Sequence, residues 1–179
     1  MSFEDAYDDE VGLLYRKFMP KVYGFLCGLG CDRGLAEEIT TDAFMAARRQ
    51  WAKVRAYDQP EYYVFKVASH ERCRRQKKHD DHAGDLYPEP QRAARGPSDD
   101  LAQRVADRAA IRHALQQLPS SQREAVLLRH YVGLPEATTA AIMKISVGAV
   151  KSYASKGRQR LRDLLGEFRA GEGGTDEFG

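Results

Sequence analysis

The chain has 179 residues, enough for one ordinary domain or two small ones. Its charged residues (30%), hydrophobic residues (42%) and net charge of only +2 are typical of a soluble, mostly helical protein with modest cores. No apolar run approaches the roughly 20 residues of a membrane-spanning helix, and the acidic N-terminus lacks the hydrophobic region of a signal peptide. These features predict a cytoplasmic protein without membrane insertion.

The three cysteines, Cys27, Cys31 and Cys73, cannot all pair within the chain and match no zinc-binding spacing with the histidines. Cys27 and Cys31 fall in or beside an apolar helical pattern, so we expect them to be small core residues rather than metal ligands. The sequence therefore predicts neither a metal site nor a cofactor.

Basic and acidic residues are segregated along the chain. Lysine and arginine cluster at 66–79 and 151–162, whereas acidic residues crowd positions 4–10 and the far tail. Clustered basic residues create a local positive field even in a nearly neutral chain.

The first half of the chain predicts three helices. Apolar residues recur at helical spacing over 11–29, where Pro20 is expected to kink or interrupt the helix. A second helix follows residues 30–34, and a third begins near Pro60 and runs into the basic cluster. No strand-like alternation is present, so the predicted class is all-α.

Residues 77–100 are rich in proline, glycine and charge without a helical period, which indicates a flexible linker between two small helical domains. We place the first domain, a helical bundle, at 10–79, the linker at 80–100 and the second domain at 101–168. Residues 169–179 are expected to form a disordered tail.

The second domain also predicts a series of helices. The first begins near residue 101 and ends at Pro119, and the next is expected to begin at a capping box, Ser121–Glu124, and to stop at Gly133. Pro135 opens a short helix that ends before a capped C-terminal helix.

The spacing of Ala140, Ile145, Ser146 and Val150 predicts a helix-turn-helix. The alanine lets two helices cross closely, the apolar residues fill the angle between them, and Ser146 supplies an N-cap worth about 1 kcal/mol. Such a motif places the N-terminal part of its second helix in the major groove of DNA. The alternative is a solvated basic face on an ordinary bundle helix.

Two features of the first domain have open interpretations. Aromatic residues over 51–65 precede the basic stretch over 66–78, which suits unstacked bases but also suits a core beside a solvated face. Glu37, Glu38 and Asp42 could favour the positive end of a helix dipole or form a docking face for a basic partner.

Four stretches, in this order and spacing, resemble the extracytoplasmic-function (ECF) class of bacterial RNA polymerase sigma factors. They are LAEEITTDAF at 35–44, YVFKVA at 63–68, LPSSQR at 118–123 and SVGAVKS at 146–152. The resemblance covers nearly the whole chain and implies that 10–79 is a σ2-like domain and 101–168 a σ4-like domain.

The resemblance implies three sets of site residues. The helix that docks on the clamp helices of core polymerase would present Glu38, Asp42 and Phe44. A loop over 51–59 would capture a flipped base of the −10 element. The residues implied to contact this element are Trp51, Tyr57, Lys66, His70, Arg74 and Arg75. The −35 element would be met by Ser146, Lys151, Ser152, Ser155, Lys156 and Arg158. The apolar surface around 126–132 would engage the polymerase flap, and an anti-sigma factor is a further conceivable partner.

The resemblance also implies the function, an alternative sigma factor that binds core polymerase and directs promoter recognition and melting. Lys144 departs from the family because glycine is frequent at this turn position, and a positive φ there would cost lysine about 1 kcal/mol. The main alternative is a free-standing helix-turn-helix regulator that binds duplex operators without polymerase. The third possibility is a metal-dependent nuclease that uses the N-terminal acids. We expect no enzyme, because those acids lie in a terminus expected to be flexible and have no partner histidine.

Overall fold

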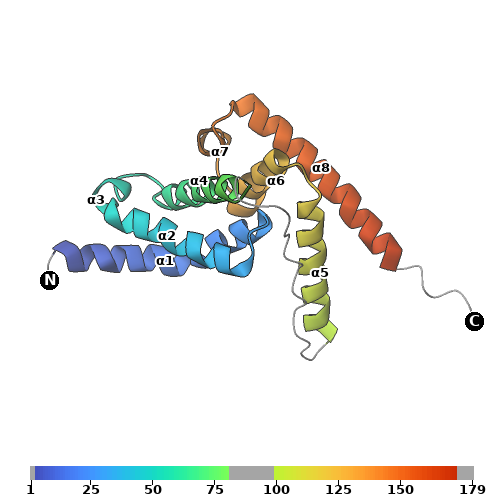
Figure 1. Ribbon diagram of the computed structural model, residues 1–179, viewed down its shortest axis with the longest axis horizontal. Coiled ribbons are helices and arrows are strands. Elements are labelled where there is room, and N and C mark those ends of the chain that lie inside the picture. Colours follow the sequence, from blue (N-terminus) through green and yellow to red (C-terminus); the bar gives the residue numbers. More distant parts are fainter. Residues whose placement is uncertain (1–2, 81–98, 173–179) are drawn as a thin grey trace, which may run out of the picture.

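The computed structural model describes residues 3–80 and 99–172, and every regular element within these two segments is helical (Figure 1). The predicted all-α class is therefore confirmed. Most of the predicted linker and tail lies outside the described residues, but helices extend into both of them, to residue 80 on one side and from residue 99 on the other, and to residue 172 at the tail.

The helices fall into two groups, which we call the first module (3–80) and the second module (99–172). The first module contains α1 (Phe3–Gly28), α2 (Arg33–Arg49), α3 (Trp51–Val54) and α4 (Glu61–Asp80). The second contains α5 (Asp99–Gln116), α6 (Ser120–Val126), the π-helical turn η1 (Leu127–Val132), α7 (Glu136–Met143) and α8 (Val147–Glu172).

The predicted interruption of the first helix at Pro20 is wrong, because α1 continues through this residue. Proline removes one backbone hydrogen bond and costs about 3 kcal/mol in a helix interior. Buried side chains on both sides of it, Val11 and Leu14 before and Phe25 and Leu26 after, belong to one hydrophobic core. Their burial offsets the local cost, so tertiary packing decides the continuity of α1.

Local capping signals set some helix ends but not all. The Asp32 carboxylate accepts a hydrogen bond from the Leu35 N–H at 2.9 Å and so caps α2. The predicted capping box at Ser121–Glu124 is wrong, because α6 begins at Ser120 without a side-chain cap. The Glu124 carboxylate instead accepts a hydrogen bond from the Ser69 hydroxyl at 2.5 Å.

The turn after α7 requires the left-handed backbone that the sequence suggested for Lys144, whose φ and ψ are 56° and 43°. Replacing it with glycine should therefore stabilise the protein by about 0.5–1 kcal/mol, because glycine adopts this conformation without a Cβ penalty. The measurement is urea unfolding followed by circular dichroism. Lys144→Ala keeps a Cβ and should leave the free energy of unfolding unchanged, so an equal gain in both variants would contradict this explanation.

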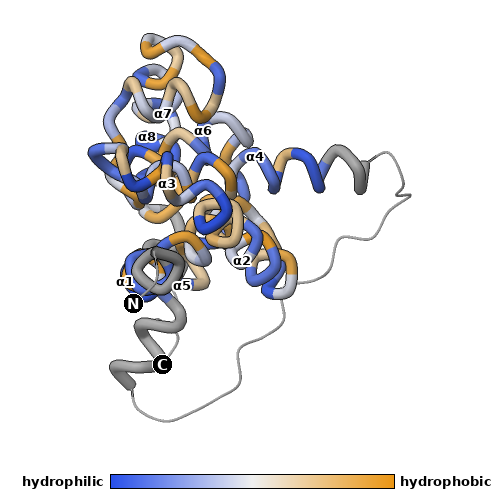
Figure 2. The backbone as a smooth tube through the Cα atoms, turned by 90° about the vertical axis from the view of Figure 1, so that its left-hand side faces the viewer, coloured by the Kyte–Doolittle hydropathy of each residue, from blue (hydrophilic) through white to orange (hydrophobic). Residues whose placement is uncertain are grey.

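The two modules share one hydrophobic core. Within the first module α1, α2 and α4 pack side by side, and α1 and α4 also contact η1 and α7 of the second module (Figure 1). Buried residues of both modules, among them Phe25, Phe65, Leu128 and Leu134, form a single cluster. Hydrophilic and hydrophobic stretches are interspersed along the helices (Figure 2). No described helix is long and apolar enough to cross a membrane.

Close contact between the modules depends on two glycines of α1. A Cβ on Gly28 would lie 2.9 Å from Leu127 Cδ2, and a Cβ on Gly24 would overlap the Tyr131 hydroxyl. Gly24 and Gly28 lie one helical turn apart, so they form a shallow surface against which η1 packs. The apolar surface at 126–132 is thereby largely buried, including Leu127, Leu128 and Val132.

Candidate nucleic-acid interface

The helix-turn-helix predicted from spacing is present as α7, a turn and α8. The Ser146 hydroxyl oxygen accepts a hydrogen bond from the Ala149 N–H at 3.1 Å, which is the predicted N-cap of α8. Ala140, Ile142 and Val150 are buried between the helices. The turn and the cap together fix the direction in which the N-terminal half of α8 projects.

The predicted DNA-contacting residues of α8 share one property, namely that their side chains are exposed. They are Ser146, Lys151, Ser152, Ser155, Lys156 and Arg158. Lys151 lies 3.4 Å from a carboxylate oxygen of Glu136, whereas Lys156 and Arg158 form no ion pair with any described residue. Their positive charge is therefore available to an anionic partner.

Near this basic face lies His130, which no sequence motif marked. Burial, followed by the positive charges of Arg158 and Arg129, lowers the pKa of His130 below its ordinary value. The lowered pKa keeps the imidazole neutral at neutral pH. The only sequence signal for it was its place next to Arg129 in the predicted helix.

Residues predicted to meet the −10 element lie in different environments. Lys66 and Tyr57 are exposed. Trp51 is only 5% exposed and lies in the short helix α3 rather than in an open loop. Its indole N–H donates a hydrogen bond to Glu10 at 2.6 Å, so Trp51 fastens α3 to α1. In this conformation the Trp51 ring is not accessible to an extruded base, whereas residues 55–59 after α3 are not helical, and their role as a base-capturing loop stays a prediction.

His70 lies at the junction of the modules rather than on a free surface. Its Nε2 atom lies 3.0 Å from the Ile142 carbonyl oxygen in α7, and the neighbouring Ser69 bonds to Glu124 in α6. Two arginines, Arg72 and Arg123, both donate to the Leu29 carbonyl oxygen at 3.2 Å. The surface of α4 that was predicted to contact the −10 DNA strand is thus partly covered by the second module.

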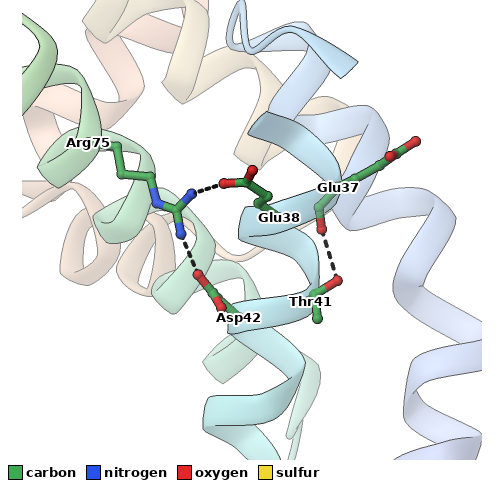
Figure 3. A pocket seen from close by; sticks show the side chains of 5 residues that line it. All are labelled: Glu37, Glu38, Thr41, Asp42 and Arg75. Carbon is green, nitrogen blue, oxygen red and sulfur yellow. Dashed lines mark hydrogen bonds and ion pairs between the residues drawn. The ribbon is translucent and has the colours of Figure 1, made fainter. Parts of the chain in front are cut away.

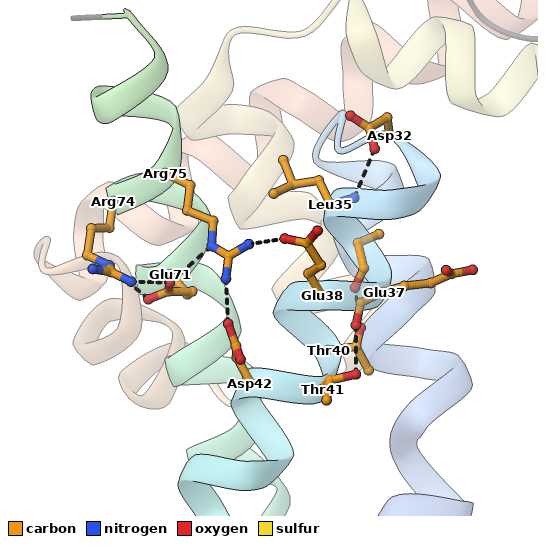
Figure 4. A network of polar contacts seen from close by, with 11 residues as sticks. Asp32, Leu35, Glu37, Glu38, Thr40, Thr41, Asp42, Glu71, Arg74 and Arg75 are labelled. Carbon is orange, nitrogen blue, oxygen red and sulfur yellow. Dashed lines mark hydrogen bonds and ion pairs between the residues drawn. The ribbon is translucent and has the colours of Figure 1, made fainter. Parts of the chain in front are cut away.

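Arg74 and Arg75 are adjacent in sequence but are held differently (Figure 4). Arg75 donates from Nε to Glu71 at 3.1 Å, from Nη1 to Glu38 at 2.6 Å and from Nη2 to Asp42. Arg74 pairs only with Glu71 among the described residues. These bonds, first that from Arg74, lower the pKa of Glu71, which therefore stays ionised. Glu71 links both arginines, a role that its position as the only acid in a basic stretch did not reveal.

The residues predicted to bind core polymerase divide into two kinds. Glu38 and Asp42 are exposed and line an open depression with Glu37, Thr41 and Arg75 (Figure 3). Phe44 is 4% exposed, and its ring packs edge-on against Tyr15 with centroids 4.9 Å apart. Phe44 therefore packs on the buried side of α2, and its side chain is not part of the exposed surface formed by Glu38 and Asp42.

Two of the N-terminal acids, Asp8 and Glu10, are part of the fold, contrary to the expected flexible terminus. Asp8 pairs with Arg48 at 2.6 Å, and Glu10 pairs with Arg55 at 3.0 Å as well as with the Trp51 indole. The bond from Arg48 lowers the pKa of Asp8. Within the described segments no cluster of three or more histidine, cysteine, aspartate or glutamate side chains is arranged to hold a metal ion.

The predicted core positions of two cysteines agree with their partial burial against the hydrophobic cluster. Cys27, Cys31 and Cys73 are all free thiols. Burial raises the pKa of the Cys31 thiol to about 11, so it stays protonated at neutral pH and is a poor metal ligand.

Comparison with known proteins identifies the family. Residues 108–161 match the family described as Sigma-70, region 4. The chain is 30% identical to the ECF RNA polymerase sigma factor SigM of Bacillus subtilis over 160 residues, which cover 84% of this chain and 92% of that protein. It is also 30% identical to the RNA polymerase sigma factor CarQ of Myxococcus xanthus over 168 residues, 92% of each chain.

A solved structure has the same fold. The sigma factor RpoE of Bartonella quintana, in complex with the anti-sigma factor NepR, superimposes with a TM-score of 0.65 at 24% identity, over 88% of this chain and 97% of that chain. Relatives of this similarity span almost the full length of the chain, with the helix-turn-helix inside the matched region. The chain belongs to the ECF family of RNA polymerase sigma factors.

Proposed function

We propose that this protein is a cytoplasmic promoter-specificity subunit that binds core RNA polymerase and directs the initiation of transcription, without catalytic activity of its own. The observation that carries the proposal is the exposed basic face of α8 behind a serine-capped helix-turn-helix, in a chain of the sigma factor family. The first module, α1 to α4, takes the σ2 role, and the second, α5 to α8, takes the σ4 role.

In this proposal α8 recognises duplex DNA at the −35 element. Lysine and serine side chains reach base edges or phosphates, and the following arginines contact the backbone. The exposed Lys156 has no ion pair with a described residue, so no ion pair with such a residue has to be broken when it contacts DNA.

Lys156→Ala should therefore weaken −35-dependent promoter binding by about 1–3 kcal/mol, the usual contribution of a contact to a base edge. The measurement is holoenzyme binding to promoter fragments with the native or a scrambled −35 element. Lys17→Ala removes an equal charge from an exposed position of α1, outside the proposed −35 surface, and is the matched control for charge. Equal losses on native and scrambled fragments would mean that Lys156 contacts only phosphate.

Promoter engagement in this proposal requires the modules to separate. The packing of α4 on α7 covers His70, and the packing of η1 on α1 covers the apolar surface at 126–132. Both surfaces were predicted to meet promoter or polymerase. Binding to polymerase can compensate for the lost contacts and hold the two modules at a fixed separation, which gives an avidity gain on DNA.

A polymerase requirement distinguishes this function from the free-standing regulator. We expect the purified chain alone to bind promoter duplex weakly at moderate salt, and to direct specific run-off transcription when core polymerase is added. Nanomolar binding of a duplex operator without polymerase would favour the regulator instead. Run-off transcription across genomic promoter fragments would identify the promoters that it uses.

A further inference from the structure

Arg75 has an unusual set of partners for a residue assigned to DNA. Each of its three guanidinium nitrogens donates to a different carboxylate, in Glu71, Glu38 and Asp42. Glu71 lies on the same helix, whereas the other two lie on α2, so the guanidinium joins α4 to α2 (Figure 4). These bonds use three of the five guanidinium N–H donors, and the three carboxylates around the group repel a phosphate.

The side chains of Glu38 and Asp42 are more exposed than those of Arg75 and Glu71. The side chain of Arg75 is 26% exposed and that of Glu71 is 17% exposed, whereas Glu38 and Asp42 are 69% and 51% exposed. Among the described residues, Glu38 Oε1 and Asp42 Oδ1 accept no hydrogen bond. The network therefore engages one oxygen of each acid and leaves the other without a donor among the described residues, on side chains that stay more than half exposed (Figure 3).

Without Arg75, no attractive interaction would hold the carboxylates of Glu38 and Asp42 close together. Glu38 and Asp42 are four residues apart on one face of α2, where like charges repel by a few tenths of a kcal/mol. Long acidic side chains on a surface also retain rotamer freedom, which a partner must restrict on binding. A guanidinium that holds both carboxylates removes the repulsion and restricts the rotamers before binding.

We propose that Arg75 is a positioning residue for the polymerase-binding surface, and not a contact to the −10 strand. This inference rests on the proposed function, because it assumes that Glu38 and Asp42 face a basic surface of core polymerase. Arg75 presents the two carboxylates at a fixed spacing, ready to accept hydrogen bonds from basic side chains. Of the two arginines first assigned to DNA, only Arg74 keeps a mostly exposed side chain, at 74%.

The planar fork of arginine is essential to this role, because three nitrogens must point in three directions at once. Lysine carries the same charge as a compact ammonium on a flexible stem and cannot reproduce that geometry. Arg75→Lys therefore removes the geometry while it keeps the charge. Arg74→Lys makes the same change at the next position of α4, where only Glu71 is contacted, and serves as the matched control.

The experiment measures binding of labelled full-length chain to purified core polymerase by anisotropy, and promoter opening by permanganate footprinting at saturating core. Arg75→Lys should weaken core binding about fivefold, in the range of a well-ordered ion-pair network. Arg74→Lys should bind core within about twofold of wild type. Once bound, the Arg75→Lys holoenzyme should open promoters as the wild type does.

A double-variant background separates positioning from general stability. With Glu38→Gln and Asp42→Asn in place, Arg75→Lys should cause no further loss of core binding, because the carboxylates it positions are gone. A purely structural role would produce the same loss in both backgrounds. Glu71→Ala provides a second variant, since it removes the acceptor that holds Arg75 on α4 without changing α2, and it should also weaken core binding.

Three outcomes would overturn the positioning role. The first is wild-type core affinity in Arg75→Lys with normal promoter opening. The second is tighter core binding, which would mean that Arg75 shields the acids. The third is wild-type core affinity with fewer open complexes, which would mean that Arg75 contacts DNA. Failure of the unmodified chain to bind core would refute the proposed function itself. That failure is seen before any variant is made, so the two results are distinguishable.

Discussion

An Asp42→Arg variant should lose about thirtyfold in affinity for core polymerase, equivalent to about 2 kcal/mol, because juxtaposed like charges cost an interface several kcal/mol at most. Asp42 is exposed on α2 and accepts a hydrogen bond from Arg75. An arginine in its place would repel Arg75 and present a positive charge to a basic partner. The proposed docking surface would then lose both its charge and its ordered carboxylates.

Glu37→Arg is the matched control for this prediction. It makes the same change of charge on the same helix, but the Glu37 side chain points away from Arg75 and pairs with Arg33 at 3.0 Å (Figure 3). We expect its core affinity to stay within about threefold of wild type. Affinity is read by anisotropy after circular dichroism has shown that both variants are folded. Wild-type affinity in a folded Asp42→Arg protein would remove Asp42 from the docking role.

Gly157→Ala should destabilise the second module by about 2 kcal/mol, in the range of overpacked core positions. In α8, a Cβ at this position would lie 2.6 Å from Val126 Cγ2 and 3.1 Å from the Gln122 carbonyl oxygen. The carbonyl belongs to the backbone of α6 and cannot rotate away as a side chain could. Alanine's higher helix propensity, about 1 kcal/mol over glycine, only partly offsets the overlap.

Gly166 provides the control for Gly157, because it lies in the same helix and a Cβ there would meet no atom of another described element within 4 Å. Gly166→Ala should stabilise the protein by about 0.5–1 kcal/mol through helix propensity alone. Both effects are measured as changes in the midpoint of urea unfolding. A stabilising Gly157→Ala would mean that α6 can shift away from α8, and that their close crossing is not required.

Local chemistry in the sequence predicted most of the helices and the DNA-binding motif. The Ser146 cap, the end of η1 at Gly133 and the strained turn at Lys144 are all present. Each depends on interactions between residues at most six apart, such as a side chain that satisfies a free backbone N–H or a residue forced to positive φ. Such signals can be recognised without knowing what lies across the core.

Local signals failed where a distant partner competed for the same residue. Glu124 could have bonded within its own helix, yet it accepts from Ser69. Pro20 lies within a continuous helix because residues on both sides of it are buried. In both cases contacts available only in the folded chain outweighed a preference of about 1–3 kcal/mol.

The site residues show the same division. The sequence by itself determined which side chains carry charge and that α8 would expose a basic face, because helical spacing fixes which residues lie together on one side. Only the tertiary structure decided that Trp51 and Phe44 are buried and that Arg75 holds two acids of α2. Burial and pairing depend on which helices pack together, and residues more than 30 positions apart meet only once the core has formed.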